Sequence, residues 1–324
     1  MSGYPPPDMT TTHNANRPVH GALFYCSERE YIDSVVRFVS EWLSVAQPVL
    51  VAVPGDKIGL LRDALGPAAR KVTMIDITEE GRNPGRLIGL LATFVERHGH
   101  QPVRIIGEPI WPERSAVEYP ACVQHEALVN VALADQDVTG VCLYDATRLG
   151  DGALADARRT HPTIWQDGSA EVNPDYAVDD ALAQCNQPLS TSPVAVTSTV
   201  CQPADLANAR RCSTRYGRLL GMSSDRLADL QLITTELATN SLDHGGGVCR
   251  LAFWHEAGHV VCEARDIGYL TDPLAGRRRP NARHAGPYGL FVVNAIADLV
   301  RTHTTPDGTT IQAYLQLDRP LVEA

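Results

Sequence analysis

Short apolar runs rich in β-branched residues alternate with longer amphipathic segments from residue 21 to about residue 165. This alternation constrains the fold more than any other feature of the chain. The apolar runs lie at 22–25, 48–53, 72–77, 103–106 and 138–144, and the segments with helical spacing lie at 28–44, 57–65, 84–98 and 119–134. Continuous apolar strands that alternate with helices are typical of a parallel sheet covered on both faces. The sequence therefore predicts an N-terminal α/β domain.

The order of elements changes in the second half of the chain. Residues 166–199 are polar and acidic and then rich in Pro, Ser and Thr, as is typical of a linker. Helical segments follow at 205–220, 224–242 and 289–300, with strand-like runs at 248–255, 259–266 and 309–317. Helices and antiparallel strands segregated in this way indicate an α+β two-layer domain. A chain of 324 residues has room for both domains.

Composition and charge limit the classes of partner. The chain has 38 acidic and 28 basic residues, so its net charge of −10 argues against direct binding of nucleic acid. The eight cysteines form no C-x-x-C pair, as expected of reduced core residues in the cytoplasm. We expect a disordered tail at 1–19, which lacks the apolar core of a signal peptide, and a cytoplasmic protein with no membrane segment.

One predicted helix carries an acid and an amide on the same face. Glu236 and Asn240 are four residues apart in the segment ELATNSLDHG, so on a helix one side chain lies above the other. An amide oxygen is a ligand for a hard cation such as Mg²⁺, and a nearby carboxylate can orient or deprotonate an attacking hydroxyl. Alone, the pair is a weak signal, and a solvated helix face would be the preferred interpretation.

Three further motifs follow in order. Asp266 and Gly268 end a predicted strand. The carboxylate could accept a hydrogen bond from the amino group of a base, and the glycine leaves room for a flat ring. A long connection, typical of a lid, then leads to the turn GPYGL at 286–290, where glycines meet the N-terminus of a helix and anions bind well. Gly308 and Thr309 open the last strand.

In this order, the motifs at 236–240, 266–268, 286–290 and 308–309 resemble the N, G1, G2 and closing boxes of the Bergerat-type ATPase fold. Gyrase, histidine kinases and anti-sigma factor serine kinases share this fold. The anti-sigma branch is the most similar, because residues 207–221 resemble its leading helix and ELATNSLDHG its N box. The resemblance implies an ATP-binding domain at 200–324.

The resemblance also implies a role for each matching residue. Glu236 would be the catalytic base or orient a water molecule, Asn240 would be the Mg²⁺ ligand, and Asp266 would bind the adenine amino group. The other residues that would contact the nucleotide are Gly268 and Thr309 beside the base and Gly286 and Gly289 beside the phosphates. Phosphoryl transfer depends mainly on positioning and on metal charge, so Asn240 should matter more than any surface charge.

Two positions depart from the family pattern. Leu270 replaces the second glycine of D-x-G-x-G, and Pro287, which has no N–H to donate to a phosphate, stands second in the phosphate turn. Two functions therefore stay open. One is an anti-sigma type protein serine/threonine kinase, and the other is a catalytically silent, ATP-gated protein-binding module. Arg277, Arg278 and Arg279 lie in the predicted lid, either as a solvated loop or in contact with phosphate or an acidic partner.

The resemblance also implies partners. The anti-sigma branch acts on a sigma factor, an antagonist protein or both, and we expect a homodimer. Histidine-kinase activity is disfavoured, because no histidine lies between His161 and His244 to act as a phosphoacceptor. The sequence does not identify the sigma factor or the antagonist.

The first domain resembles a sensory domain. The segments IGEPIW at 106–111, CLYD at 142–145 and THP at 160–162, together with Glu126-x-x-x-Asn130, are similar to the MEDS sensory domain, which is RecA-like in fold. The resemblance covers 20–176, leaves 177–199 as a linker and implies control by an unidentified small-molecule ligand. Glu108 and Asp145 follow strands at the carboxyl edge, where α/β sheets bind ligands, and either contact a ligand or hold loops.

Two other motifs have simpler explanations. The segment HEAGH at 255–259 satisfies the zinc-protease pattern H-E-x-x-H, but β-prone runs flank it and favour a hairpin with Ala257 and Gly258 at its tip. The segment PGDK at 54–57 lacks the spacing of a phosphate-binding loop, so a plain strand-to-helix turn is favoured.

Overall fold

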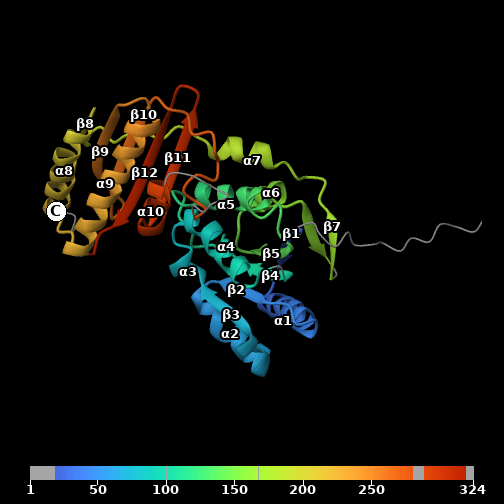
Figure 1. Cartoon of the computed structure of the whole chain (residues 1–324). Coiled ribbons are helices and arrows are strands. Elements are labelled where there is room, and N and C mark those ends of the chain that lie inside the picture. Colours follow the sequence, from blue (N-terminus) through green and yellow to red (C-terminus); the bar gives the residue numbers. More distant parts are fainter. Residues whose placement is uncertain (1–18, 100, 167, 280–287, 319–324) are drawn as a thin grey trace, which may run out of the picture.

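The computed structural model describes residues 19–99, 101–166, 168–279 and 288–318. The disordered tail expected at 1–19 lies outside these ranges except for Val19, which begins the first strand. Two sheets, each with its own helices, lie beside each other (Figure 1). None of the helices in the described ranges is long and apolar enough to cross a membrane.

The N-terminal sheet has seven strands in the order β3-β2-β4-β5-β1-β6-β7. The strands are β1 (Val19–Tyr25), β2 (Val49–Val53), β3 (Val72–Asp76), β4 (Val103–Gly107), β5 (Val138–Asp145), β6 (Thr163–Gln166) and β7 (Ser169–Val172). All pairings are parallel except that of β6 with β7. The expected α/β domain is therefore confirmed. The β6–β7 hairpin was not predicted, because β7 is exposed throughout and has no apolar alternation.

Helices cover both faces of this sheet. Helices α1 (Glu28–Ser44) and α2 (Gly55–Leu65) pack on one face. The other helical elements of this domain are η1 (Gly66–Lys71), α3 (Ile77–Glu80), η2 (Pro84–Arg86), α4 (Leu87–Arg97), α5 (Tyr119–Ala132), α6 (Asp151–Thr160) and α7 (Val178–Cys185). Of these, α4, α5, α6 and α7 bury apolar residues against the opposite face. Helix α7 forms where the sequence predicts an irregular linker.

The C-terminal sheet is antiparallel, with five strands in the order β11-β12-β10-β9-β8. The strands are β8 (Val196–Val200), β9 (Cys249–Glu256), β10 (His259–Asp266), β11 (Leu299–Thr305) and β12 (Gly308–Gln316), and the helical elements are η3 (Pro203–Asp205), α8 (Leu206–Leu219), α9 (Ser224–His244) and α10 (Tyr288–Ile296). The expected α+β layers are confirmed. Helix α10 ends at Ile296 rather than at residue 300, and residues 299–305 form a strand that was not predicted.

Side chains alternate between the two faces of the C-terminal sheet. Leu251, Phe253 and Cys262 belong to the core beneath α8, α9 and α10. On the other face, Trp254 and Tyr314 form an apolar cluster with Ala121 of α5. The N-terminal domain therefore covers part of the outer face of the C-terminal sheet.

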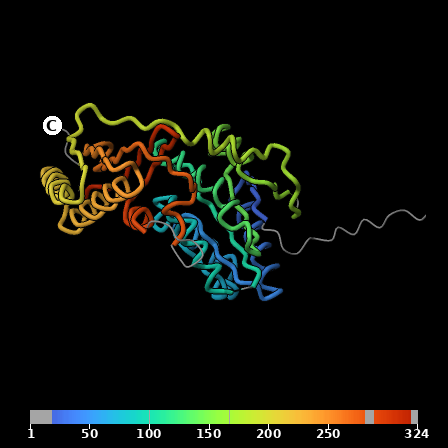
Figure 2. The backbone as a smooth tube through the Cα atoms, turned by 45° about the horizontal axis from the view of Figure 1, so that its top comes forward, coloured from blue at the N-terminus to red at the C-terminus, as the bar shows by residue number. Residues whose placement is uncertain are grey.

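Polar contacts also join the domains. Asn83 is fully buried, and its Nδ2 donates to the carbonyl of Asn294 at 2.9 Å, while its Oδ1 accepts from the N–H of Val300 at 3.3 Å. Arg82 pairs with the buried carboxylate of Asp298. The segment between α7 and β8 runs from one domain to the other (Figure 2), and Asn186 bonds to the backbone of Thr304 on the way.

Candidate functional site

Helix α9 presents the predicted acid and amide to the start of α10. The N-cap of α9 is Ser223, whose Oγ accepts from the N–H of Arg226 at 3.4 Å. Glu236 and Asn240 are both half-buried. A Cβ added to Gly289 would lie 2.6 Å from Glu236 Oε2 and 3.0 Å from Asn240 Nδ2, so α10 begins directly against the pair. The predicted grouping of these three residues is therefore present in the structure.

Asp266 lies at the end of β10 with its carboxylate partly satisfied. Ser241 of α9 donates to its Oδ2 at 2.5 Å, and the N–H of Gly268 donates to its Oδ1 at 2.9 Å. Burial raises the pKa of Asp266, and these two hydrogen bonds oppose that rise. Gly245 allows the close approach of α9, since a Cβ there would lie 2.3 Å from the Asp266 carboxyl carbon.

Gly268 and Thr309 lie on either side of this carboxylate. A Cβ on Gly268 would lie 2.6 Å from the carbonyl oxygen of His244, so the position has room for a glycine alone. The hydroxyl of Thr309 donates to the carbonyl of Gly268 at 2.8 Å, and Thr309 pairs with Asp266 across the β10–β12 ladder. The closing motif therefore lies beside the D-x-G motif, as the sequence predicts.

These residues surround one cavity of about 460 Å³. The lining includes four of the predicted residues, namely Asn240, Asp266, Gly268 and Thr309, together with apolar residues such as Leu237, Ala264, Leu290 and Ile311. Glu236 and Gly289 lie beside it, and Gly286 and Pro287 lie outside the described residues. An apolar slot with a carboxylate at its end suits a flat heteroaromatic ring that carries an amino group.

The residues after β10 form one wall of this cavity and contact the N-terminal domain. Leu270 donates its N–H to Thr304 Oγ1 at 3.0 Å. Arg278 lines the cavity and donates to the carbonyl of Val131 at 3.1 Å, while the buried Arg277 bonds to the side chain of Gln124. A solvated loop, one of the two alternatives that the sequence left open, is therefore wrong for Arg277. Burial lowers the pKa of this guanidinium to about 10.

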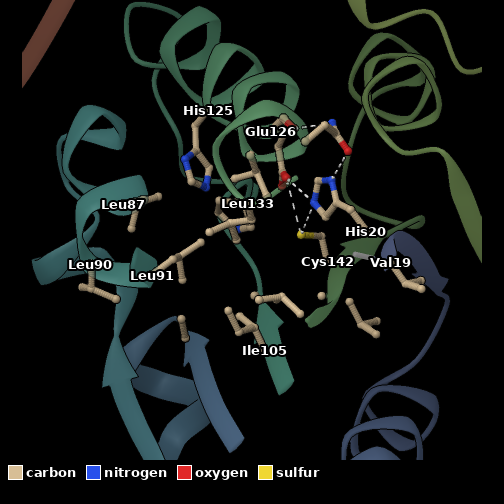
Figure 3. A pocket seen from close by; sticks show the side chains of 18 of the residues that line it. Val19, His20, Leu87, Leu90, Leu91, Ile105, His125, Glu126, Leu133 and Cys142 are labelled. Carbon is tan, nitrogen blue, oxygen red and sulfur yellow. Dashed lines mark hydrogen bonds and ion pairs between the residues drawn. The ribbon is translucent and has the colours of Figure 1, made fainter. Parts of the chain in front are cut away.

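The N-terminal domain contains a second cavity, of about 230 Å³, between its sheet and helices α4 and α5 (Figure 3). Most of its lining is apolar, including Leu87, Leu91 and Ile105. His20, Glu126 and Cys142 point toward one another on one wall. This group was not predicted from the sequence, although the Glu126-x-x-x-Asn130 and THP segments were available as signals.

The carboxyl edge of the parallel sheet holds its own polar group. Lys57 Nζ donates to Glu108 Oε1 at 2.5 Å and to the hydroxyl of Tyr25 at 2.8 Å. Glu108 is fully buried, and burial raises its pKa, which Lys57 opposes. Asp145 accepts bonds from the N–H groups of Thr147 and Arg148, so it holds its loop, as the simpler of the two predictions states.

The HEAGH segment is a hairpin turn. It connects β9 to β10, with His259 paired to Glu256 and with Ala257 and Gly258 both at positive φ, 47° and 78°. A zinc-protease site needs both histidines on one helix face. The metalloprotease alternative is therefore wrong.

Family models divide the chain between the two sheets. The model described as MEDS, MEthanogen/methylotroph, DcmR Sensory domain, matches residues 19–162, and the model of the histidine kinase-like ATPase domain matches residues 200–315. The chain joins a MEDS domain to a histidine kinase-like ATPase domain. The cavity beside Asp266 thus lies in the ATPase domain, and the cavity beside His20 lies in the MEDS domain.

Two solved structures are similar to parts of this chain at low identity. The SiaB-SiaC complex from Pseudomonas aeruginosa is similar at 11% identity, over 37% of this chain and 88% of that chain, with a TM-score of 0.31. The RsbU and RsbW domains of a Mycobacterium tuberculosis protein are similar at 17% identity, over 44% of this chain and 41% of that chain, with a TM-score of 0.30. The search of curated proteins gave no match.

Proposed function

We propose that this protein is a cytoplasmic signalling regulator whose ATPase domain binds Mg-ATP and phosphorylates or sequesters a partner protein under the control of its MEDS domain. The observation that carries the proposal is the convergence of Asn240, Asp266, Gly268 and Thr309 on one cavity. These residues come from three separate segments of the chain, so their meeting is not a consequence of local sequence.

The cavity beside Asp266 suits adenine. An ionised Asp266 would accept a hydrogen bond from the amino group of the base, while Gly268 leaves room for the ring. Thr309 lines the same cavity, and bonds to Thr304 and to the carbonyl of Gly268 hold its hydroxyl in place. Guanine carries a carbonyl where adenine carries the amino group, so the carboxylate would favour adenine.

Glu236, Asn240 and Gly289 suit the phosphate end. Asn240 Nδ2 is buried and has no hydrogen-bond partner within the described residues, as expected of a side chain that waits for a ligand. Its amide oxygen would hold Mg²⁺, which neutralises phosphate charge when bound. Glu236 would orient or deprotonate the attacking group. These roles rest on the resemblance together with the proximity of the three residues.

Different residues favour the two functions that the sequence leaves open, a kinase and a silent binding module. The close pairing of Glu236 with Asn240 favours a kinase. Leu270 favours the binding module, because its N–H donates to Thr304 and is not free for a phosphate, and its side chain packs against the core. In either case we propose that the partner is a sigma factor or its antagonist, and that the protein is a homodimer.

Helix α5 connects the two cavities. Glu126 and Val129 on α5, and Leu133 directly after it, line the MEDS cavity. The same helix contacts the residues after β10 through the side chain of Gln124 and the carbonyl of Val131. A small, largely apolar molecule in the MEDS cavity would displace α5 and so alter the lid of the ATP site. The buried Arg277 favours such a switch, since release of the lid would rehydrate its charge.

Nucleotide binding is tested by thermal unfolding of the full chain with and without millimolar Mg-ATP. We expect Mg-ATP to raise the melting temperature of the wild type and not that of Asn240→Ala. The control is Asp243→Ala, an exposed position on α9 outside the cavity lining, which should keep the shift. The absence of a shift in the wild type would refute ATP binding.

Kinase activity is tested by incubating the full chain with labelled ATP and candidate antagonist proteins. Label on a serine or threonine of the antagonist, lost in Glu236→Gln while Mg-ATP binding persists, supports the kinase. Complex formation that depends on ATP but transfers no label supports the binding module instead. If neither occurs with any sigma factor or antagonist tested, the proposed partner class is wrong.

A further inference from the structure

Four buried side chains from different parts of the MEDS domain meet beside its cavity. They are His20 on β1, Glu126 on α5, Cys142 on β5 and His161 just after α6, and each is at most 9% exposed. One ligand atom from each residue lies within 4.8 Å of all the others. Figure 3 shows three of them, with dashed lines between His20, Glu126 and Cys142.

The separations match the edges of a small tetrahedron. His20 Nε2 lies 3.3 Å from Cys142 Sγ and 3.2 Å from Glu126 Oε2, which in turn lies 3.4 Å from both Cys142 Sγ and His161 Nε2. Ligand atoms about 2.0 to 2.3 Å from a tetrahedral Zn²⁺ are about 3.3 to 3.8 Å apart. Four of the six separations are therefore close to the edges of a zinc tetrahedron, and the other two, which join His161 to His20 and to Cys142, are at most 4.8 Å.

The surrounding hydrogen bonds fix the tautomer of His20. The Nδ2 of Asn130 donates to the carbonyls of Ala127 and Thr160 at 3.1 and 2.9 Å, so its Oδ1 must face His20. His20 Nδ1, at 3.1 Å from that oxygen, is therefore a donor. Its Nε2, which points into the cluster, is left with a lone pair when the ring is neutral.

His161 and Glu126 are oriented in the same way. His161 Nδ1 lies 2.7 Å from the carbonyl of Ala157 and donates to it, and its Nε2 is buried without a hydrogen-bond partner within the described residues. The hydroxyl of Tyr144 donates to Glu126 Oε1 at 2.9 Å, which leaves Oε2 facing the cluster. Bonds from outside the cluster thus orient a lone pair of His20, His161 and Glu126 toward its centre, as is typical of the groups that support metal ligands.

The cluster lacks the protons that would satisfy these lone pairs. With neutral histidines, two imidazole nitrogens, a carboxylate oxygen and a sulfur share only the thiol proton of Cys142, in a buried and largely apolar setting. A divalent cation would accept all four lone pairs. The thiolate and the carboxylate carry two negative charges, so a divalent ion would also make the buried group neutral.

We propose that His20, Glu126, Cys142 and His161 form a zinc site in the MEDS domain. Imidazole and thiolate ligands select Zn²⁺ over Mg²⁺ or Ca²⁺, which prefer oxygen. Binding would release the thiol proton of Cys142 to solvent and form one bond from each residue to the ion. The site would tie β1, β5 and the end of α6 to α5, the helix that contacts the lid of the ATPase domain.

The test uses the full chain, with no affinity tag, stripped of metal by a chelator and reloaded with Zn²⁺ or Co²⁺. We expect one ion per chain by elemental analysis and a higher melting temperature with Zn²⁺ than without. The cobalt form should show the visible bands of a tetrahedral site and a thiolate-to-cobalt charge-transfer band in the near ultraviolet. A wild-type chain that binds neither ion would overturn the proposal.

Matched cysteine variants locate the site. Cys142→Ala should lose the thiolate-to-cobalt band and the Zn²⁺-dependent stabilisation, while Cys122→Ala should keep both, because Cys122 is fully buried in the same apolar cluster but outside the ligand set. His161→Ala should bind at least 10-fold more weakly than the Cys122→Ala control. If Cys142→Ala keeps the charge-transfer band, the ion binds elsewhere and the proposal is wrong.

Asn130 provides a milder variant that keeps all four ligands. Asn130→Ala removes the acceptor that orients His20, so we expect Zn²⁺ affinity to fall about 10- to 100-fold with the cobalt spectrum still present at saturation. Circular dichroism of the metal-free variants shows whether they fold. Unchanged Zn²⁺ affinity in this variant would contradict the assigned geometry. Because the readouts are metal content, spectrum and stability, they do not depend on whether the ATPase domain binds nucleotide.

Discussion

At the scale of single residues, Lys57 is the one cation bonded to the buried carboxylate of Glu108 within the described residues. We expect Lys57→Met to destabilise the chain by about 3 to 5 kcal/mol, because it leaves an uncompensated buried charge. Denaturant unfolding measures the loss. The double variant that adds Glu108→Gln should recover part of it, and a double variant as unstable as the single one would show that Lys57 acts through packing alone.

The same pair predicts a pH dependence. Burial raises the pKa of Glu108 in the folded protein, so the folded state holds this proton more tightly than the unfolded state does. Protonated Glu108 therefore contributes to the free energy of unfolding at low pH, and this contribution is lost as the pH rises through the raised pKa. Removing Lys57 raises that pKa further. The destabilisation by Lys57→Met should therefore be smaller at acid pH than at neutral pH in denaturant titrations.

Asp266 predicts the pH dependence of nucleotide binding. Only the ionised carboxylate is purely a hydrogen-bond acceptor, as the adenine amino group requires. Burial raises the pKa of Asp266. ATP affinity should fall as the pH drops through that raised value, at a higher pH than an ordinary carboxyl would give. Calorimetry of Asp266→Asn should show a loss of about 1.5 to 3 kcal/mol and a flat pH profile in this range. An unchanged profile would exclude Asp266 as the contact.

The sequence predicted individual residues well where a motif was local. Glu236 and Asn240 share a helix face, so their spacing was sufficient to group them. The zinc ligands come from elements far apart in the chain, and their common orientation depends on bonds to Asn130, Tyr144 and the carbonyl of Ala157. The segments that contain several of these residues were visible in the sequence, but their spacing does not show that the side chains meet.

At the scale of elements, the start of α10 needs a glycine. An alanine at 289 would place its Cβ against Glu236 and Asn240, so Gly289→Ala should abolish Mg-ATP binding while changing stability by no more than about 1 kcal/mol. The control is Gly59→Ala in α2, where an added Cβ meets nothing within 4 Å. The Gly59→Ala variant should be more stable than the wild type and should bind ATP as the wild type does. Normal ATP binding by Gly289→Ala would contradict the proposed phosphate site.

The sequence predicted most elements, and its errors have a common cause. Helix α1 begins and ends where the pattern places it, because an amphipathic period and the Ser27 cap coincide. The apolar run around Ile296 to Val300 fits a helix or a strand equally well, and only the pairing of β11 with β12 decides it. Strand β8 was missed for the same reason, since it is largely exposed and depends on its pairing with β9.

At the scale of the whole molecule, Asn83 joins the two domains. Asn83→Ala leaves the buried carbonyl of Asn294 and the N–H of Val300 without their partner. Each lost partner should lower the free energy of unfolding by about 1 to 3 kcal/mol. We expect calorimetry to show two separate unfolding transitions in this variant and a single one in the wild type. Thr93→Ala, an exposed change on α4, should keep the single transition. Two transitions already present in the wild type would contradict this coupling.

The covered outer face of the C-terminal sheet limits how such a protein can be rearranged. Trp254 and Tyr314 are buried by contact that includes Ala121. A gene fusion that transplanted the ATPase domain alone would leave an aromatic patch bare, and the fragment would tend to aggregate. Exchange of one sensor for another would succeed only with an incoming helix that presents an equally small side chain at that contact.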